Sequence, residues 1–317
     1  MGVSGAEPVA LGIDIGGSNT KLGLVNARGE LRAFRRFPTE ARGRDPGPFL
    51  DQLFAHADAV MAEAGGAVIG VGVSTHGYID DARNGPVVCG NTPALAGVNL
   101  RGLLAERYRL PAVLNNDLIA HALAEYRFGS GRGVRRFLGV AVGTGLGAGV
   151  IINGAPLRYF GGQAGDTGRI ILEPGGPTCV YGVSGSAEAL CGVPGIERLA
   201  RERYGRDVPA HAVIAAARAG NDPIAAGVMA QIGAYLGHAL AIWSVLFMPE
   251  RAAITGGTAE AGPVLLEACR RRFGELIGGY HRTVAAMAGE TPRDVEIVLG
   301  EMRGETGVVG AVVELFE

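Results

Sequence analysis

Short apolar segments separated by glycine-rich turns dominate the first third of the chain. Residues 10–37 predict two or three strands, with a turn at residues 26–29. Apolar side chains then recur every three or four positions, which predicts a helix over residues 48–64. A strand over 67–74, a short helix over 100–108, a strand over 112–115 and a helix over 117–128 follow.

The rest of the chain continues the same alternation. Two strands, 137–142 and 147–152, flank a second glycine turn. Helical segments are predicted over 185–204, 222–247, 264–277 and 307–316, and strands over 252–255 and 295–299. Because strands and helices alternate along the whole length, the sequence predicts an α/β protein.

Composition narrows the class of protein. The chain has 317 residues, of which 48% are hydrophobic and 19% charged, enough for a large core in one large or two ordinary domains. The net charge of −2 and the absence of a basic run give no sign of a nucleic-acid surface. Four scattered cysteines form no disulfide pattern, and the longest apolar stretch, 138–153, is interrupted by glycines. We therefore expect a soluble cytoplasmic protein without a nucleic-acid or membrane partner.

One motif places an acid inside an apolar strand: GIDIGGSNTKLGLV, residues 12–25, with Asp14 before the paired glycines. A buried carboxylate is costly unless something pairs with it, so Asp14 either caps the turn or awaits a cation. The segment GVAVGTGLGAGVII, 139–152, repeats the plan of strand, glycine turn and strand. Two such tips could be ordinary hairpins, but together with Asp14 they favour a pair of phosphate cradles.

Five segments in order resemble the ROK family of repressors, open reading frames and kinases, within the superfamily of sugar kinases, actin and heat-shock ATPases. They are DIGGSNTK (14–21), NNDLIAHALAE (115–125), VGTGLGAG (142–149), MPERAAITGG (248–257) and LGEMRGETGVVGAV (299–312). The resemblance implies two actin-like (ribonuclease H-like) domains around a central cleft, and a homodimer. We expect residues 1–116 plus 305–317 to form the small domain and 117–304 the large one.

The resemblance also implies roles for the residues around the sugar. Asp117 matches the catalytic base; without the family match, it would be read as the N-cap of the following helix. Asn116 and Asn91 match asparagines that bind sugar hydroxyls. Asp14 matches the acid that faces Mg²⁺, through water because Mg²⁺ keeps much of its hydration shell; the alternative is a turn-capping acid.

The nucleotide side is implied by the glycine motifs. ATP phosphates would lie against the backbone of the two turns, with contacts from Gly16, Gly17, Thr20, Lys21, Gly143, Thr144 and Gly145. For Lys21, a solvated strand lysine is an equal alternative. Gly256 and Gly257 would lie against the adenosine, or form a simple strand-to-helix turn.

The chain departs from the family where its members bind a structural zinc. The family pattern is Glu-x-Gly-His followed by CxCGxxGCxE, whose histidine and three cysteines are the ligands. Here the first motif begins at Asp166 and ends at Arg169, and the second runs from Cys179 to Glu188, with tyrosine and serine at two cysteine positions. A tetrahedral site needs four donors and arginine cannot be one, so we expect no zinc and a small buried Cys179.

The same departure affects the substrate. In the family, the residues matching Asp166, Arg169 and Glu188 address the C1 and C2 end of the sugar. The end that carries the reacting hydroxyl is unchanged here, so amino sugars and sugar-like cyclitols are plausible beside glucose. Alternatively, Arg169 fills the space of the missing zinc and pairs with Asp166 or Glu173.

These observations predict an ATP-dependent and Mg²⁺-dependent kinase for the primary hydroxyl of a hexose, amino sugar or C7-cyclitol. A non-catalytic, sugar-responsive regulator of the same family is one alternative. Such regulators resemble this chain only after a DNA-binding extension, and because the phosphate motif here begins by Gly12, we expect no such extension. A kinase that uses polyphosphate is the other alternative, although no long basic run marks a groove for it.

Overall fold

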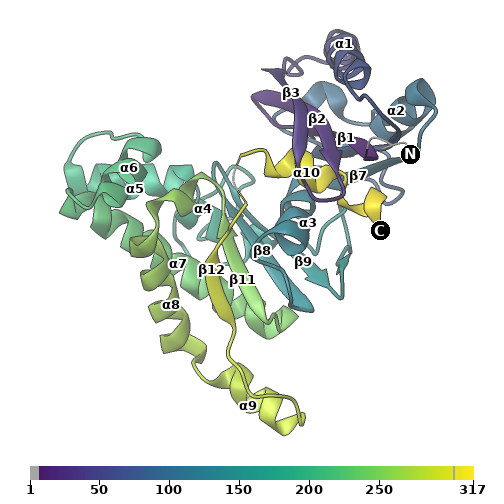
Figure 1. Cartoon of the computed structure of the whole chain (residues 1–317). Helices are drawn as coiled ribbons and strands as arrows, with labels where there is room; N and C mark the ends of the chain where they lie inside the picture. The colour runs from purple at the N-terminus through teal and green to yellow at the C-terminus, as the bar shows by residue number, and fades with distance from the viewer. Residues whose placement is uncertain (1–6, 303) are drawn as a thin grey trace. The chain divides into compact units, whose positions relative to one another are not determined.

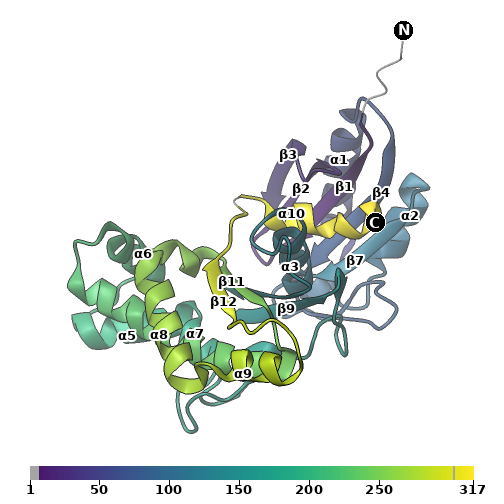
Figure 2. The same cartoon turned by 60° about the horizontal axis from the view of Figure 1, so that its bottom comes forward.

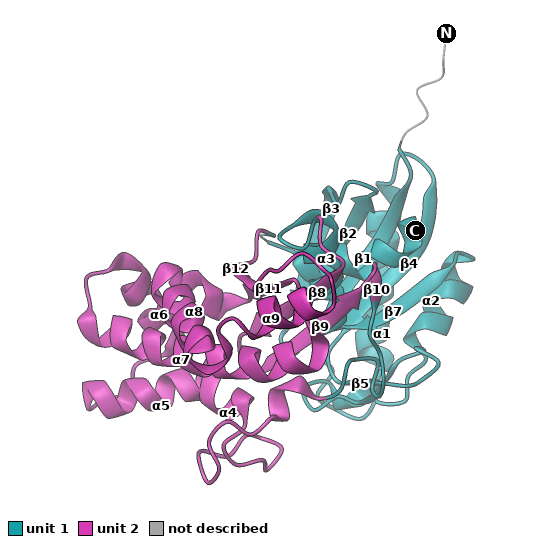
Figure 3. Cartoon of the chain, turned by 90° about the horizontal axis from the view of Figure 1, so that it is seen from below, with its two compact units in different colours: residues 1–132, 156–165, 302–317 teal, residues 133–155, 166–301 magenta. Residues whose placement is uncertain are grey.

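The structure is a computed structural model that describes residues 7–302 and 304–317 (Figure 1). It divides into two compact units, coloured separately in Figure 3. Unit 1 comprises the chain up to residue 132 together with residues 156–165 and 302–317, and unit 2 comprises residues 133–155 and 166–301. Each unit is built around one five-stranded sheet.

The sheet of unit 1 has the strand order β3-β2-β1-β4-β7. Strands β1, β2 and β3 form antiparallel hairpins, whereas β1, β4 and β7 run parallel. Helices α1 and α2 pack on one face and α3 and α10 on the other. The elements are β1 (Val9–Ile15), β2 (Asn19–Asn26), β3 (Leu31–Pro38), α1 (Gly47–Ala62), β4 (Val68–Thr75), α2 (Leu100–Tyr108), β7 (Ala112–Asn116), α3 (Asp117–Phe128) and α10 (Thr306–Ala311).

Two glycines bring the last helix onto this sheet. Gly12 of β1 and Gly72 of β4 are neighbours in register. A Cβ atom on Gly12 would lie 2.3 Å from the carbonyl oxygen of Val308, and one on Gly72 would lie 2.1 Å from that of Ala311. The backbone of α10 therefore rests directly on the sheet, and Figure 1 shows this helix in yellow beside α3.

The segment 156–165 belongs to unit 1 although it follows a strand of unit 2. It lies beside a small hairpin, β5 (Tyr78–Ile79) and β6 (Pro86–Val88), which precedes a 3₁₀ turn at Pro93–Leu95. The Ile79 N–H donates to the Gly161 carbonyl at 3.0 Å. The rings of Tyr78 and Phe160 pack with their centroids 5.7 Å apart.

Unit 2 repeats the sheet plan of unit 1. Its strand order is β10-β9-β8-β11-β12, with an antiparallel β8–β9 hairpin and parallel β8, β11 and β12. Gly139 faces Gly149 across this hairpin, as Gly12 faces Gly23 across the first one. The repeat seen in the sequence is therefore a structural repeat. The strands are β8 (Arg136–Val142), β9 (Leu146–Ile152), β10 (Ala155–Pro156), β11 (Arg251–Thr255) and β12 (Glu296–Leu299).

Several helices accompany the second sheet (Figures 1 and 2). They are α4 (Ala187–Cys191), α5 (Val193–Tyr204), α6 (Ala210–Ala219), α7 (Pro223–Phe247), α8 (Pro263–Ile277) and α9 (Tyr280–Met287), with 3₁₀ turns at Thr167–Arg169 and Gly257–Ala261. Among the described residues, α7 is the one helix whose length and composition would suit a membrane span. More than half of it is buried, chiefly against α8, as in the core helix of a globular unit.

The elements agree with the sequence predictions except in a few places. The helix predicted over 185–204 is broken at Gly192 into α4 and α5, and the one over 307–316 ends as a 3₁₀ turn, Val313–Phe316. The short strands β5, β6 and β10 and the helices α6 and α9 were not predicted. The α/β class is confirmed.

The division into units differs from the expected domains at helix α3 and at residues 156–165. Helix α3 packs against α10, so contacts group it with unit 1, whereas we placed everything from residue 117 in the large domain. The domain boundaries themselves remain a prediction.

Candidate active site

Polar side chains line up where the parallel strands of unit 1 end. Asp14, Ser74 and Asn115 are neighbours in register on β1, β4 and β7, so they share one face of the sheet. The Ser74 hydroxyl donates a hydrogen bond to Oδ1 of Asp14 at 2.8 Å. Ligands of open α/β sheets bind at the carboxyl ends of the strands, which makes this edge the candidate site of unit 1.

Asn116 and Asp117 both stand at the start of helix α3, and the structure shows which of them is the N-cap. Asn116 is the N-cap: its Oδ1 accepts from the Leu118 N–H at 2.9 Å, and its Nδ2 donates to the Gly77 carbonyl at 2.8 Å. Its amide is bonded to the backbone at both ends, and that it also binds sugar hydroxyls remains a prediction. Asp117 is the first helical residue, and one of its oxygens, Oδ1, also accepts from the Leu118 N–H, at 3.0 Å.

The carboxyl group of Asp117 has an unusual environment. Although the residue keeps some exposed surface, burial raises the pKa of the Asp117 carboxyl above its ordinary value. His121 and His76 act to lower this pKa, while the negative charge of Asp14 acts to raise it. A raised pKa suits a group that must accept a proton from an alcohol near neutral pH.

The pH dependence of the reaction should report this carboxyl group. We expect kcat/KM for the sugar to fall on the acid side with a midpoint above about 4, the ordinary value for aspartate, because Asp117 must be ionised to act. Since the charge of His121 lowers the pKa of Asp117, His121→Asn should move the midpoint to higher pH. A profile that is flat to below pH 4, or an unmoved midpoint in the variant, contradicts the assignment.

Asn91 lies next to the first glycine turn. A Cβ atom on Gly17 would come within 2.9 Å of Cβ of Asn91, so the asparagine packs against this turn. His76, which the sequence did not single out, connects the two: one ring nitrogen lies 3.2 Å from the Ile15 carbonyl and the other 3.2 Å from the Thr92 hydroxyl. His76 follows β4 directly, which is the one signal that could have marked it.

The polar residues of strand β2 do not all face the site. Ile15 pairs with Thr20 and Asp14 with Lys21, so Thr20 lies on the opposite face of the sheet from Asp14. Thr20, which we expected at the nucleotide, is buried, and its hydroxyl lies 2.7 Å from that of Thr39. The ammonium of Lys21 forms an ion pair with Glu305 at 2.6 Å and is neither free nor merely solvated.

A partly buried ionic network fixes the end of β7, and sequence reasoning missed it. The Asn115 amide donates to Glu314 at 2.6 Å, while its oxygen accepts from Arg83 at 2.9 Å and from Arg158 at 2.7 Å. Both arginines also form ion pairs with Glu314, at 2.6 Å and 3.0 Å. Because Asn115 stands two residues before Asp117, the C-terminal segment helps to position the candidate base.

In unit 2, the second glycine turn is supported by an acid. Oε2 of Glu188 accepts from the Leu146 N–H at 3.3 Å, and a Cβ atom on Gly145 would lie 2.6 Å from the same oxygen. The Gly143 carbonyl accepts from the Val193 N–H at 2.9 Å, which joins the turn to the start of α5. Thr144 is exposed at the tip.

Arg169 also reaches Glu188. One guanidinium nitrogen, Nη1, lies 2.8 Å from Oε2 of Glu188, and Nε lies 3.5 Å from the Asp166 carboxylate. The guanidinium stacks over the ring of Tyr181 at 4.5 Å. The ion pair with Asp166 that we considered is present, and Glu188 rather than Glu173 is the second partner.

The glycines expected at the nucleotide fall into two groups. A Cβ atom on Gly16, Gly17, Gly145 or Gly256 would meet protein atoms within 3 Å, so packing alone explains those four. Gly256 also has φ +85°, and its added Cβ would lie 2.3 Å from the Val142 carbonyl oxygen. A Cβ atom on Gly143 or Gly257 would meet nothing within 4 Å, so the space beside both Cα atoms is open, and the Gly143 N–H itself donates to the Gly145 carbonyl at 2.9 Å.

Comparison with known proteins shows the family to which the chain belongs. The sequence profile of the ROK family matches residues 10–313. The chain belongs to the ROK family. A glucokinase of Halalkalibacterium halodurans is 30% identical over 283 residues, which cover 83% of this chain and 84% of the relative. An N-acetylmannosamine kinase of Escherichia coli is 34% identical over 194 residues, 60% of this chain and 64% of the relative.

A solved structure extends the likeness to three dimensions. The ROK family glucokinase of Streptomyces griseus, in complex with glucose and AMPPNP, has a TM-score of 0.78 and 28% identity. The alignment covers 96% of this chain and 97% of that chain. The predictions of the family and of a sugar kinase are confirmed.

Proposed function

We propose that this ROK kinase transfers the γ-phosphoryl group of ATP to the primary hydroxyl of a hexose or a hexose-like molecule, with Asp117 as the general base. The observation that carries the proposal is the carboxyl end of the parallel strands in unit 1. There Asp117, whose pKa is raised by burial, stands close enough to Asp14 for their charges to interact. Phosphoryl transfer to an alcohol needs a proton acceptor and a counter-charge for the phosphates, and this edge offers both.

Asp14 is the residue that would hold Mg²⁺. Its carboxylate is partly exposed, and the Ser74 hydroxyl donates to one of its two oxygens. No group of three or more His, Cys, Asp or Glu side chains that could hold a metal occurs in the described part of the chain. Mg²⁺ commonly takes one or two carboxylates and completes its shell with water and substrate phosphates, so Asp14 could serve it with a single carboxylate.

The open glycines support a nucleotide on the side of unit 2. Gly143 lies in the turn between β8 and β9, and Gly257 lies two residues after the end of β11. Backbone N–H groups in glycine turns form concave sites for phosphate oxygens, and a side chain would block that approach. We assign Gly143, Thr144 and Gly145 to the phosphates and Gly256 and Gly257 to the adenosine side.

Gly143→Ala should separate ligand binding from folding. The new methyl group meets no protein atom, so the melting temperature should stay within about 2 °C of the wild type. If the backbone here contacts phosphate, KM for ATP should rise roughly tenfold or more, the scale of a lost hydrogen bond to a charged group. Gly274→Ala in α8, also in open space, is the matched control. Equal KM values in both variants contradict the placement of the phosphates.

For the substrate, we propose that Asp166, Arg169 and Glu188 face the end of the sugar remote from the reacting hydroxyl, and that Asn91 contacts the sugar at the other end. The test is a panel of glucose, mannose, amino sugars, N-acetylated amino sugars and C7-cyclitols, each assayed with ATP and with polyphosphate. We expect one class to be phosphorylated with ATP. No phosphorylation of any member, or activity with polyphosphate alone, contradicts the proposal.

Two further points stay proposals: that the enzyme is a homodimer and that it acts in the cytoplasm. Light scattering of the purified protein tests the first and cell fractionation the second.

A further inference from the structure

The four positions that bind zinc in other members of the family lie together in this chain but do not fit a metal. They carry Arg169, Cys179, Tyr181 and Ser186. Only the cysteine is a usual zinc donor, and the permanently charged guanidinium repels a cation. The question is what holds this region together instead.

The contacts of Arg169 answer it. The side chain is only 17% exposed and lies between two carboxylates, those of Glu188 and Asp166. Its flat face covers the ring of Tyr181 at 4.5 Å, so it reaches across to the loop that begins at Thr178. One arginine thereby joins the 3₁₀ turn Thr167–Arg169, the loop and the start of helix α4.

Cys179 is part of the same cluster. Burial acts to raise the pKa of its thiol, but backbone N–H groups of the loop, the Ser186 hydroxyl and the charge of Arg169 outweigh burial and lower the pKa. The thiol is partly exposed, contrary to the buried position that we expected. Cys179 thus interacts with the Ser186 hydroxyl, the Tyr181 backbone and the charge of Arg169, while Arg169 stacks on Tyr181.

The cluster continues to the second glycine turn. The oxygen of Glu188 that Arg169 binds is the one that accepts from the Leu146 N–H and lies against Gly145. The neighbouring Thr167 hydroxyl accepts from the Ala148 N–H at 2.8 Å. Loss of the arginine would therefore loosen not only the loop but also the turn next to Gly143.

We propose that Arg169, stacked on Tyr181 and paired with Glu188 and Asp166, is a metal-free brace that replaces the zinc of related proteins and positions the second glycine turn. The brace is a property of unit 2 alone. Whatever its role toward the sugar, Arg169 acts on the second glycine turn through Glu188 and is a positioning residue for that turn.

The first test is metal content and stability. The purified, untagged protein should contain far less than one zinc per chain, and EDTA should leave its melting temperature unchanged, because no metal binding is coupled to folding. Arg169→Met removes the charge from between two carboxylates and should lower the melting temperature by roughly 5 °C or more. Stoichiometric zinc, or an unchanged melting temperature in this variant, overturns the proposal.

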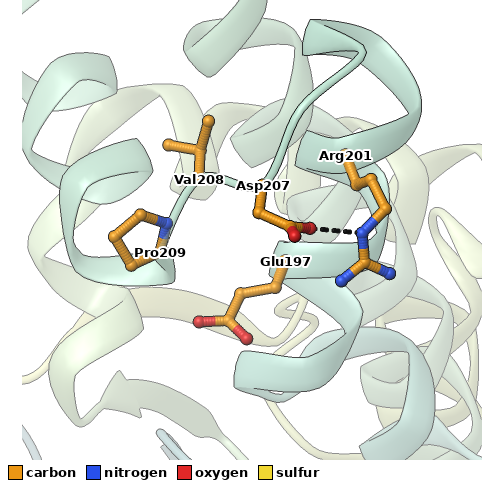
Figure 4. A pocket seen from close by; sticks show the side chains of 5 residues that line it. All are labelled: Glu197, Arg201, Asp207, Val208 and Pro209. Atoms are coloured by element: carbon orange, nitrogen blue, oxygen red, sulfur yellow. Dashed lines mark hydrogen bonds and ion pairs between the residues drawn. The ribbon is translucent and has the colours of Figure 1, made fainter.

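The matched control is Arg201→Met in helix α5 of the same unit. Arg201 pairs with Asp207 at the rim of a surface hollow that Glu197, Val208 and Pro209 also line (Figure 4). Both partners are largely exposed, with 63% and 81% of their side-chain surfaces open to solvent. Exposed pairs contribute little, so this variant should melt within about 2 °C of the wild type.

The second test asks whether the second glycine turn is still positioned. It measures the affinity for AMPPNP by calorimetry, which needs no catalysis. Arg169→Met should weaken binding by roughly tenfold, the scale of one loosened hydrogen bond to a charged group. Arg169→Lys, which keeps a positive charge for Glu188, should recover part of the lost affinity for AMPPNP. A merely structural arginine would give lower stability with unchanged AMPPNP affinity in the variant that remains folded, and that result overturns the positioning role.

The third test converts the cluster around Arg169 into a zinc site. The triple variant Arg169→His, Tyr181→Cys and Ser186→Cys supplies four donors together with Cys179. We expect it to bind one zinc per chain and to lose stability on addition of EDTA, unlike the wild type. A folded triple variant that takes up no zinc shows that the four positions do not enclose a metal-sized site, and contradicts the replacement. These results do not depend on which sugar the enzyme phosphorylates.

Discussion

Asp117→Asn is expected to lower kcat by at least roughly 10² to 10⁴-fold, the usual contribution of a general base. Asparagine keeps the size of the side chain and an oxygen for the Leu118 N–H, but it cannot take the proton of the substrate hydroxyl. The measurement is steady-state turnover with saturating ATP and sugar. Turnover close to that of the wild type contradicts the assignment of Asp117.

The same variant should not be less stable at pH 7. Burial raises the pKa of Asp117 in the folded protein, so the charged form is disfavoured there relative to the unfolded chain. The ionised carboxylate therefore costs stability at any pH above its folded pKa, and that cost disappears as the pH falls through this pKa and the group is protonated. A neutral asparagine removes the cost at neutral pH. A melting temperature equal to or slightly above that of the wild type is the expected result.

A matched control uses the same substitution at another helix start. Asp222 is the N-cap of α7, and its side chain accepts from the N–H groups of Ile224 and Ala225. Asparagine caps helices about as well as aspartate. Asp222→Asn should leave kcat within about twofold of the wild type, so a large loss in both variants would point to a general effect of the substitution on folding.

The second large effect concerns the packing of the last helix. Gly310 of α10 lies so close to α3 that a Cβ atom on it would be 1.8 Å from the Ala120 carbonyl oxygen. Backbone cannot move aside as a flexible side chain can. Gly310→Ala should lower the free energy of unfolding by about 3 kcal/mol or more, which corresponds to a fall in melting temperature of roughly 6 °C or more.

Gly274→Ala in α8 is again the control, because its Cβ atom would stand in open space inside a helix. There the change should stabilise slightly, by about 0.5–1 kcal/mol, since alanine favours helix over glycine. Thermal unfolding of the two variants beside the wild type measures both effects. If Gly310→Ala has the same melting temperature as the wild type, α10 does not pack on α3 as the structure has it.

The sequence predicted those parts of the fold in which apolar and polar or glycine positions alternate with a clear period. Strands that alternate with glycine, and amphipathic helices such as α1, have a clear period. Helix α6 was missed although Ala210, Val213, Ile214 and Ala217 have helical spacing and form its buried face, because alanine fills six of its ten positions and gives little contrast between its apolar and polar sides. The break between α4 and α5 follows from Gly192 and Pro194, a signal that was present in the sequence.

The candidate site could be predicted only as far as its motifs are local. Asp14, the Asn116–Asp117 pair and the two glycine turns are each continuous in sequence. Thr20 was assigned to the nucleotide because it lies in the motif, but the pairing Ile15–Thr20 turns it to the core face of the sheet. Whether a residue of a hairpin faces a ligand depends on register, and the motif alone does not fix register.

Contacts between distant segments could not be predicted from the sequence, for a different reason. Glu314 and Arg83 are 231 residues apart, and no spacing rule joins them. The partner of Lys21 is Glu305, at the other end of the chain. Such pairs arise because the C-terminal segment returns to the first sheet, and only the folded structure shows which side chains then meet.

The central claim is that this chain phosphorylates a primary hydroxyl of a hexose-like substrate with Asp117 as the base. The most direct measurement is ³¹P and ¹³C NMR of the product formed from ATP and the best substrate of the panel, with wild type and Asp117→Asn side by side. We predict a single phosphate monoester on the primary carbon with the wild type, and at least about a hundredfold slower formation with the variant. Phosphate on any other carbon, or equal rates for the two proteins, would contradict the account.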